Sequence, residues 1–193
     1  MRDKLDARTK WSYCIGATGR DAAYALVSMY LILYVQYTMN LTSAKFAVIS
    51  GAMILCMVWD AINDLLMGII IENTHFKMGK FKPWILAGSI TNAIVIVCLF
   101  TIRPSGWGFV AFYSFFYLLW GMTYTMNDIA YWGVLPSLSS DPGTRDSLVT
   151  IMSIFVCVGQ FSVAGVVPVV IAGNAVKAYR IVAVVVALCL IAF

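Results

Sequence analysis

Five charged side chains stand inside long apolar runs of the sequence: Arg20, Asp21, Asp60, Asp64 and Asp128. A charged side chain near the centre of a membrane helix costs about 2.5–3.5 kcal/mol on insertion scales. Such residues persist where they face the interior of a helix bundle or a water-filled cavity, and they then serve transport or binding by default. The alternative is a structural network in which the carboxylates pair with Arg20 and with lysines. These five residues are the first candidates for a functional site.

Asp60, Asn63 and Asp64 have the spacing of neighbours on one helix face. Two carboxylates on adjacent turns repel each other in a low-dielectric medium when both are ionised. A bound cation or a proton removes this repulsion, and clustered carboxylate and amide oxygens suit a hard cation such as Na⁺. With Asp128, the cluster is predicted to bind a coupling cation, either Na⁺ at Asp60, Asp64 and Asp128 or H⁺. We expect no other cofactor.

A second pattern places aromatic side chains and a carboxylate at every fourth position of one run: Trp120, Tyr124, Asp128 and Trp132. Aromatic faces stack on the C–H surface of a sugar, and a carboxylate accepts hydrogen bonds from its hydroxyl groups. Asp21 and Tyr24 lie on one side of the first apolar run. The combination suits a polyhydroxylated ligand, although helix packing and interface aromatics explain the pattern equally well. A small polar stripe that ends at Gln160 is interpreted as a helix–helix contact.

The composition places these residues in a membrane. The chain has 193 residues, of which 62% are apolar or aromatic and 11% are charged, and its mean hydropathy is +0.88. A soluble domain is about 45–50% apolar and about 25% charged, so the excess must face lipid. The single histidine and five dispersed cysteines give no metal-ligand or nucleophile constellation, so an enzyme is not expected. The net charge of +4 is spread over loops and gives no support to nucleic-acid binding.

Six apolar runs are long enough for membrane helices or nearly so, and they predict an all-α membrane protein. Their expected ranges are 13–38, 44–71, 83–102, 106–135, 145–171 and 178–193. The last run is short of a full span of roughly 20 residues, so we expect residues 1–193 to be a fragment that stops inside a helix. We expect the carboxylates of Asp21, Asp64 and Asp128 at one depth, about 12 Å from one membrane boundary.

The distribution of lysine and arginine favours a cytoplasmic N-terminus, because positive charges concentrate in cytoplasmic loops. With this orientation the cytoplasmic segments hold eight of these residues: Arg2, Lys4, Arg8, Lys10, Lys77, Lys80, Lys82 and Arg145. The opposite loops hold four: Lys45, Arg103, Lys177 and Arg180.

The loop that follows the second run is acidic at its start and basic afterwards, with Glu72 before Lys77, Lys80 and Lys82. Glu72 could pair with a neighbouring helix end in one conformation and release it in another, which would make this loop a gate. The alternative is an ordinary positively charged cytoplasmic loop, which explains the lysines but not Glu72.

Three motifs resemble those of the glycoside–pentoside–hexuronide:cation symporters, which include the melibiose permease and belong to the major facilitator superfamily. They are Gly16-Ala17-Thr18-Gly19-Arg20-Asp21, Trp59-Asp60-Ala61-Ile62-Asn63-Asp64 followed by Gly79-Lys80-Phe81-Lys82-Pro83-Trp84, and Asp128-Ile129-Ala130-Tyr131-Trp132-Gly133-Val134-Leu135-Pro136. The resemblance covers about residues 10–193. Because the family has twelve helices in two halves, it implies that this chain is the six-helix N-terminal half, with the C-terminal half absent.

The resemblance also implies uptake of a sugar or glycoside coupled to Na⁺, Li⁺ or H⁺. By residue match, the cation site would contain Asp60, Asn63, Asp64, Thr125 and Asp128. The sugar site would contain Arg20, Asp21, Asp128 and Trp132, to which the aromatic pattern adds Tyr24 and Tyr124. The expected partners are the sugar, the cation, the lipid bilayer of the plasma or inner membrane, and the missing half or a second copy. The alternative is a transport-inactive truncated half or a membrane assembly subunit.

Overall fold

A computed structural model of the protein describes residues 6–192. This part of the chain folds into six helices and contains no strand: α1 (Ala7–Thr38), α2 (Ser43–Asn73), α3 (Lys82–Thr101), α4 (Trp107–Leu138), α5 (Pro142–Val170) and α6 (Ala175–Ala192). The all-α fold expected from the sequence is confirmed. Arg2 and Lys4 of the charge count and Phe193 of the last expected helix lie outside the described residues.

Several helices extend beyond the expected apolar runs. α1 begins at Ala7 rather than at residue 13, and α4 continues to Leu138 rather than 135. Hydropathy locates the apolar part of a helix, whereas the helix itself continues while its backbone groups find partners. α5 begins at Pro142 because the Asp141 carboxylate accepts a hydrogen bond from the Thr144 N–H at 2.8 Å and caps the first turn.

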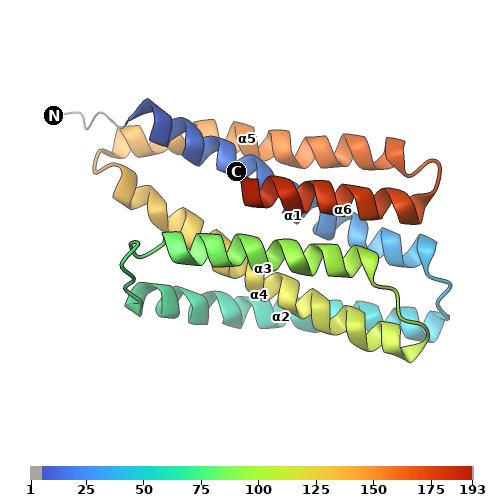
Figure 1. The fold of residues 1–193 in the computed structure, drawn as a ribbon. Coiled ribbons are helices and arrows are strands. Elements are labelled where there is room, and N and C mark those ends of the chain that lie inside the picture. Colours follow the sequence, from blue (N-terminus) through green and yellow to red (C-terminus); the bar gives the residue numbers. More distant parts are fainter. Residues whose placement is uncertain (1–5, 193) are drawn as a thin grey trace.

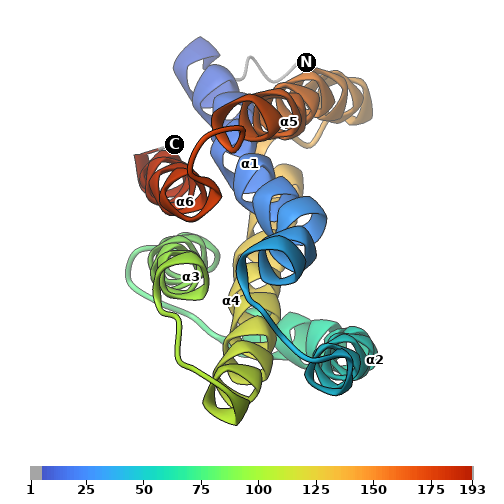
Figure 2. The same ribbon diagram turned by 90° about the vertical axis from the view of Figure 1, so that its right-hand side faces the viewer.

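The helices run side by side, with the connecting loops at two opposite ends (Figure 1). Loops 74–81 and 139–141 lie at one end, which we call the Lys80 end. Loops 39–42, 102–106 and 171–174 lie at the other, which we call the Arg103 end. α1 packs against α5 and α6, α4 packs against α2 and α3, and α3 contacts α6 (Figure 2).

Four helices, α2, α3, α5 and α6, are long and apolar enough to cross a membrane by length and composition. α1 and α4 are each 32 residues long but are not among these four helices. They carry part of the expected site, including Arg20, Asp21 and Asp128, whereas Asp60 and Asp64 lie on α2. The chain is a multi-pass membrane protein, and α1, which carries Arg20 and Asp21, has the most buried residues of the six helices.

Two sets of polar contacts hold α4 in register with its neighbours. The Asn92 amide of α3 donates to the Trp120 carbonyl at 3.1 Å, and the Asn127 amide of α4 donates to the Ile85 carbonyl at 2.9 Å. At the Lys80 end the rings of Tyr13 and Tyr131 stack at 4.6 Å, and each hydroxyl donates to the other's backbone carbonyl. These bonds fix how α1 and α4 present the residues between them.

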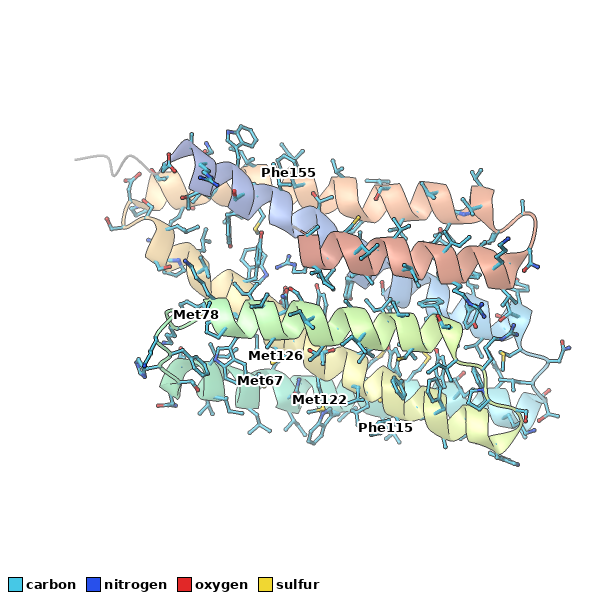
Figure 3. All side chains as sticks on the ribbon, in the orientation of Figure 1. Met67, Met78, Phe115, Met122, Met126 and Phe155 are labelled. Atoms are coloured by element: carbon cyan, nitrogen blue, oxygen red, sulfur yellow. The ribbon has the colours of Figure 1, made fainter. Side chains whose placement is uncertain are left out.

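α1 and α5 cross closely at Gly159, and side chains also link the two helices. The Trp11 ring of α1 lies 6.2 Å from the ring of Phe155 on α5, which Figure 3 labels. The Thr18 hydroxyl donates to the Phe155 carbonyl at 3.2 Å. A Cβ atom at Gly159 would overlap the Thr18 carbonyl oxygen. Glycine is therefore needed here for the approach of two backbones.

The Gly159→Val variant is expected to lose about 1–3 kcal/mol of stability, because the rigid α1 backbone cannot move away from the added side chain. The measurement is the thermal unfolding of the detergent-solubilised protein. Gly165→Val is the matched control on the same helix, since no atom lies within 4 Å of a Cβ at that position. Equal losses in the two variants would contradict the close crossing.

Candidate functional site

A cavity of about 310 Å³ lies between α1, α2 and α4. Its walls combine carboxylates, hydroxyl groups, aromatic rings and thioethers: Tyr24, Ser28, Met53, Met57, Asp60, Asp64, Tyr117, Trp120, Gly121, Tyr124, Thr125, Asp128 and Ile129. Six residues expected in the cation or sugar site are among them: Tyr24, Asp60, Asp64, Tyr124, Thr125 and Asp128. Helices far apart in the sequence thus bring both expected sets of residues to one cavity.

The α2 carboxylates face α4 across this cavity. The Thr125 hydroxyl donates to Asp64 Oδ1 at 3.0 Å. Asp60 Oδ1 is buried and has no hydrogen-bond partner among the described residues, so it is an acceptor available to a cation. Asn63 is only 3% exposed, does not line the cavity, and its Nδ2 lacks a partner within residues 6–192. Asn63 is therefore placed beside the expected cation site rather than on its wall.

Arg20 connects the two expected sites. Its side chain is buried, with the residue 4% exposed, and its guanidinium lies 2.8 Å from Asp21 Oδ2 and 3.0 Å from Asp128 Oδ1. The guanidinium also lies over the Tyr131 ring, 4.6 Å from its centroid. Asp128 is thus both a wall of the cavity and the partner of an arginine on another helix.

Asp128 shares the cavity wall with the α2 carboxylates while it pairs with Arg20. In the described part of the chain, no three His, Cys, Asp or Glu side chains are close enough together to hold a metal ion. The Na⁺ site expected at Asp60, Asp64 and Asp128 stays a prediction. Arg20 neutralises Asp128 from the α1 side in this structure, so a cation would compete with the guanidinium for this carboxylate.

The aromatic residues form one stack beside the carboxylates. The Tyr24 ring lies 5.0 Å from Tyr124 and 6.0 Å from Trp120, and Trp120 lies 5.9 Å from Tyr124. These separations are within the range of favourable aromatic pairs. Trp132 lies outside the cavity wall, is 39% exposed, and reaches the site through the Arg20 guanidinium, 5.8 Å from its ring.

Sequence reasoning missed two kinds of site residue. Gln160 of α5 donates to Asp21 Oδ1 of α1 at 3.3 Å, so the helix–helix contact expected for its polar stripe also reaches a residue of the expected sugar site. Gly121 lies directly against Asp60, because a Cβ atom there would be 2.6 Å from Asp60 Oδ1. Tyr117, Gly121 and Thr125 recur every four residues, and this spacing could have identified Gly121.

The expected gating loop lies apart from the cavity, at the Lys80 end. Glu72 lines a second cavity of about 480 Å³ with Phe81 and Gly133. A Cβ at Gly133 would be 2.5 Å from the Phe81 ring, so the loop packs directly on α4. Neither Glu72 nor Lys77, Lys80 or Lys82 takes part in an ion pair within residues 6–192. Within this part of the chain Glu72 therefore has no ion-pair partner, and its gating role stays a prediction.

A family model described as MFS/sugar transport protein matches residues 12–193. The chain belongs to this family. Within it, the resemblance to the glycoside–pentoside–hexuronide:cation symporters is confirmed by similar proteins that carry such names. The family consists of transporters rather than enzymes.

Three relatives illustrate the range of similarity. The chain is 30% identical to a lactose permease of Lactobacillus helveticus, over 78% of this chain and 24% of that protein. It is 27% identical to a raffinose carrier protein of Pediococcus pentosaceus, over 72% and 23%. It is 26% identical to a putative glycoside/cation symporter of Escherichia coli strain K12, over 84% and 35%. The chain therefore spans about a quarter to a third of the length of these relatives.

Proposed function

We propose that this chain forms the N-terminal half of a cell-membrane symporter that couples sugar or glycoside uptake to a cation by alternating access. The observation that carries the proposal is the shared cavity, in which the Asp60 and Asp64 carboxylates face the Tyr24, Trp120 and Tyr124 rings. The names of the relatives support lactose, raffinose and other glycosides as substrates to test.

In the proposed mechanism the cation neutralises the α2 carboxylates, with Na⁺, Li⁺ and H⁺ as the candidates. Asp60 Oδ1 and the Thr125-bound Asp64 would supply its oxygens, with Asn63 behind them. Asp128 would join this site when Arg20 turns toward Asp21 and a sugar hydroxyl. Because Asp128 would contribute to both sites, each ligand would favour the binding of the other, and this coupling is reciprocal.

The proposal also needs a partner for the exposed apolar faces of α2 and α5. Large apolar side chains on both helices point outward, among them Leu55 at 72%, Leu65 at 72% and Phe161 at 76% exposed. Surfaces of this kind in a membrane bundle face lipid or another bundle. A second half of the transporter, or a second copy of this chain, would complete the substrate path.

The test is sugar uptake by the full-length gene product in cells that lack their own glycoside transporters. We expect accumulation of radiolabelled lactose or raffinose that depends on Na⁺, Li⁺ or a proton gradient. Asp60→Asn and Asp64→Asn are each expected to abolish this dependence, because an amide cannot balance the charge of the cation.

Asp146→Asn is the matched control, since Asp146 is an exposed acid at the start of α5, away from the cavity. Cation-coupled uptake that survives in both cavity variants would contradict the mechanism. Absence of uptake with every sugar and cation, from a protein that reaches the membrane, would favour a transport-inactive subunit instead.

A further inference from the structure

An apolar groove of about 270 Å³ runs between α3 and α6, away from the sugar cavity. Its walls are entirely apolar or thiol-bearing and include Val97, Cys98, Val184, Leu188 and Ile191. Figures 1 and 2 both show α3 and α6 side by side on the outside of the bundle. The groove is therefore open to the acyl chains of the bilayer.

Two basic residues of α6 lie on the helix face that continues into this groove. Lys177 and Arg180 precede Val184, Leu188 and Ile191 at steps of three or four residues, which is the spacing of one helical stripe. Both cationic residues are exposed, and they lie in the first two turns of α6, next to the Arg103 end. A cationic rim thus leads directly into an apolar groove.

A third cation approaches the same end from the α3–α4 loop. The Arg103 guanidinium donates to the Thr38 carbonyl and lies 6.0 Å from the centroid of Tyr34. The Tyr34 ring is 5.2 Å from Tyr179, the residue before Arg180. Lys177, Arg180 and Arg103 are therefore three basic residues at the same end of the bundle, and we call them the basic cluster.

α3 and α6 supply no counter-ion for this cluster. The sequence has no aspartate or glutamate between residues 73 and 127 or after Asp146, so α3 and α6 contain no acid. Both ion pairs in the described part of the chain involve the buried Arg20, and neither involves Lys177, Arg180 or Arg103. A cluster of like charges at a membrane surface is stabilised by an anionic lipid headgroup.

From this arrangement we infer that α3 and α6 form a binding site for an anionic phospholipid. One acyl chain lies in the groove along Val184 and Leu188, and the phosphate sits between Arg180 and Lys177, with Arg103 beside them. The groove selects for an acyl chain, and the basic residues select for a negatively charged headgroup. A zwitterionic lipid lacks the net negative charge and free phosphate lacks the acyl chain, so neither meets both requirements.

The test is native mass spectrometry of the full-length gene product titrated with phosphatidylglycerol or phosphatidylcholine of the same chains. We expect the first phosphatidylglycerol to bind more tightly than phosphatidylcholine. Removing one cation should weaken this binding about fivefold, and Arg180→Gln with Lys177→Gln about 25-fold. Arg180→Lys keeps the charge and should retain binding.

Two further variants separate the parts of the site. Val184→Trp fills the groove and should weaken both lipids, whereas Lys45→Gln is the control, because Lys45 lies 5.8 Å from the Trp107 ring on another face of the same end. Equal affinity for the two lipids in the unmodified protein would overturn the inference. So would unchanged binding in the double variant, or displacement of the lipid by glycerol phosphate at equal concentration.

Discussion

The Arg20→Gln variant of the full-length gene product is expected to lose both sugar uptake and about 3–5 kcal/mol of stability. Arg20 is buried and neutralises two carboxylates at once, Asp21 at 2.8 Å and Asp128 at 3.0 Å. Removing one partner of a buried ion pair leaves an uncompensated charge in a low-dielectric interior, which costs more than the pair contributes. Thermal unfolding in detergent and radiolabelled lactose uptake measure the two effects.

Two further variants separate the charge of Arg20 from its shape. Arg20→Lys keeps one positive charge but cannot contact both carboxylates as the planar guanidinium does, so stability should largely return while uptake stays low. Combining Arg20→Gln with Asp21→Asn removes one of the two unpaired acids and should recover part of the stability. An Arg20→Gln protein that unfolds at the same temperature as the unmodified protein would show that the buried network is not structurally required.

Much of this site could be predicted from the sequence because depth in a membrane is nearly linear in residue number. Counting 1.5 Å per residue from the ends of the expected apolar runs places Asp21, Asp64 and Asp128 at one expected depth. The structure then places Asp64 and Asp128 on one cavity wall, with Asp21 one contact away through Arg20. The aromatic spacing of Trp120 and Tyr124 was informative for the same reason.

The pairing of Arg20 with Asp128 could not be predicted, because it depends on how α1 and α4 are rotated about their own axes. That rotation is set by contacts far from the site, such as the reciprocal bonds of Tyr13 and Tyr131. Spacing within one helix carries no such information. The expectation of Na⁺ at Asp60, Asp64 and Asp128 counted acids by depth and did not assign the nearby base to one of them, and it stays a prediction.

The helix ends also could not be predicted from hydropathy. α5 begins at Pro142 because Asp141 caps it, and α1 begins at Ala7 in a charged segment that no hydropathy pattern marks. Close approaches are also invisible to hydropathy, since Gly121 and Gly165 differ only in what packs against them. Glycine at a helix crossing has meaning only once the opposing residue is known.

The Gly121→Ala variant is expected to keep its fold but to raise the cation concentration for half-maximal uptake about tenfold or more. A Cβ at this position would lie 2.6 Å from Asp60 Oδ1 and 3.3 Å from its Cγ, so the carboxylate must rotate away from α4. The displaced group is the end of a side chain rather than a backbone, so the shift costs little stability. It nevertheless moves one of the two carboxylates proposed to hold the cation.

Two constants of the Gly121→Ala variant decide whether Gly121 positions Asp60: the half-saturating cation concentration and the KM for the sugar. The three atoms nearest to a Cβ at Gly121 all belong to Asp60, so the KM for lactose at saturating cation should change much less than the half-saturating Na⁺ concentration. Gly51→Ala is the control within the same bundle, because a Cβ there meets nothing within 4 Å. If Gly121→Ala instead lowers the unfolding temperature and raises both constants together, Gly121 serves helix packing. A selective change in the cation constant would place Gly121 among the residues that position Asp60, and would tie the close α2–α4 contact to coupling rather than to stability.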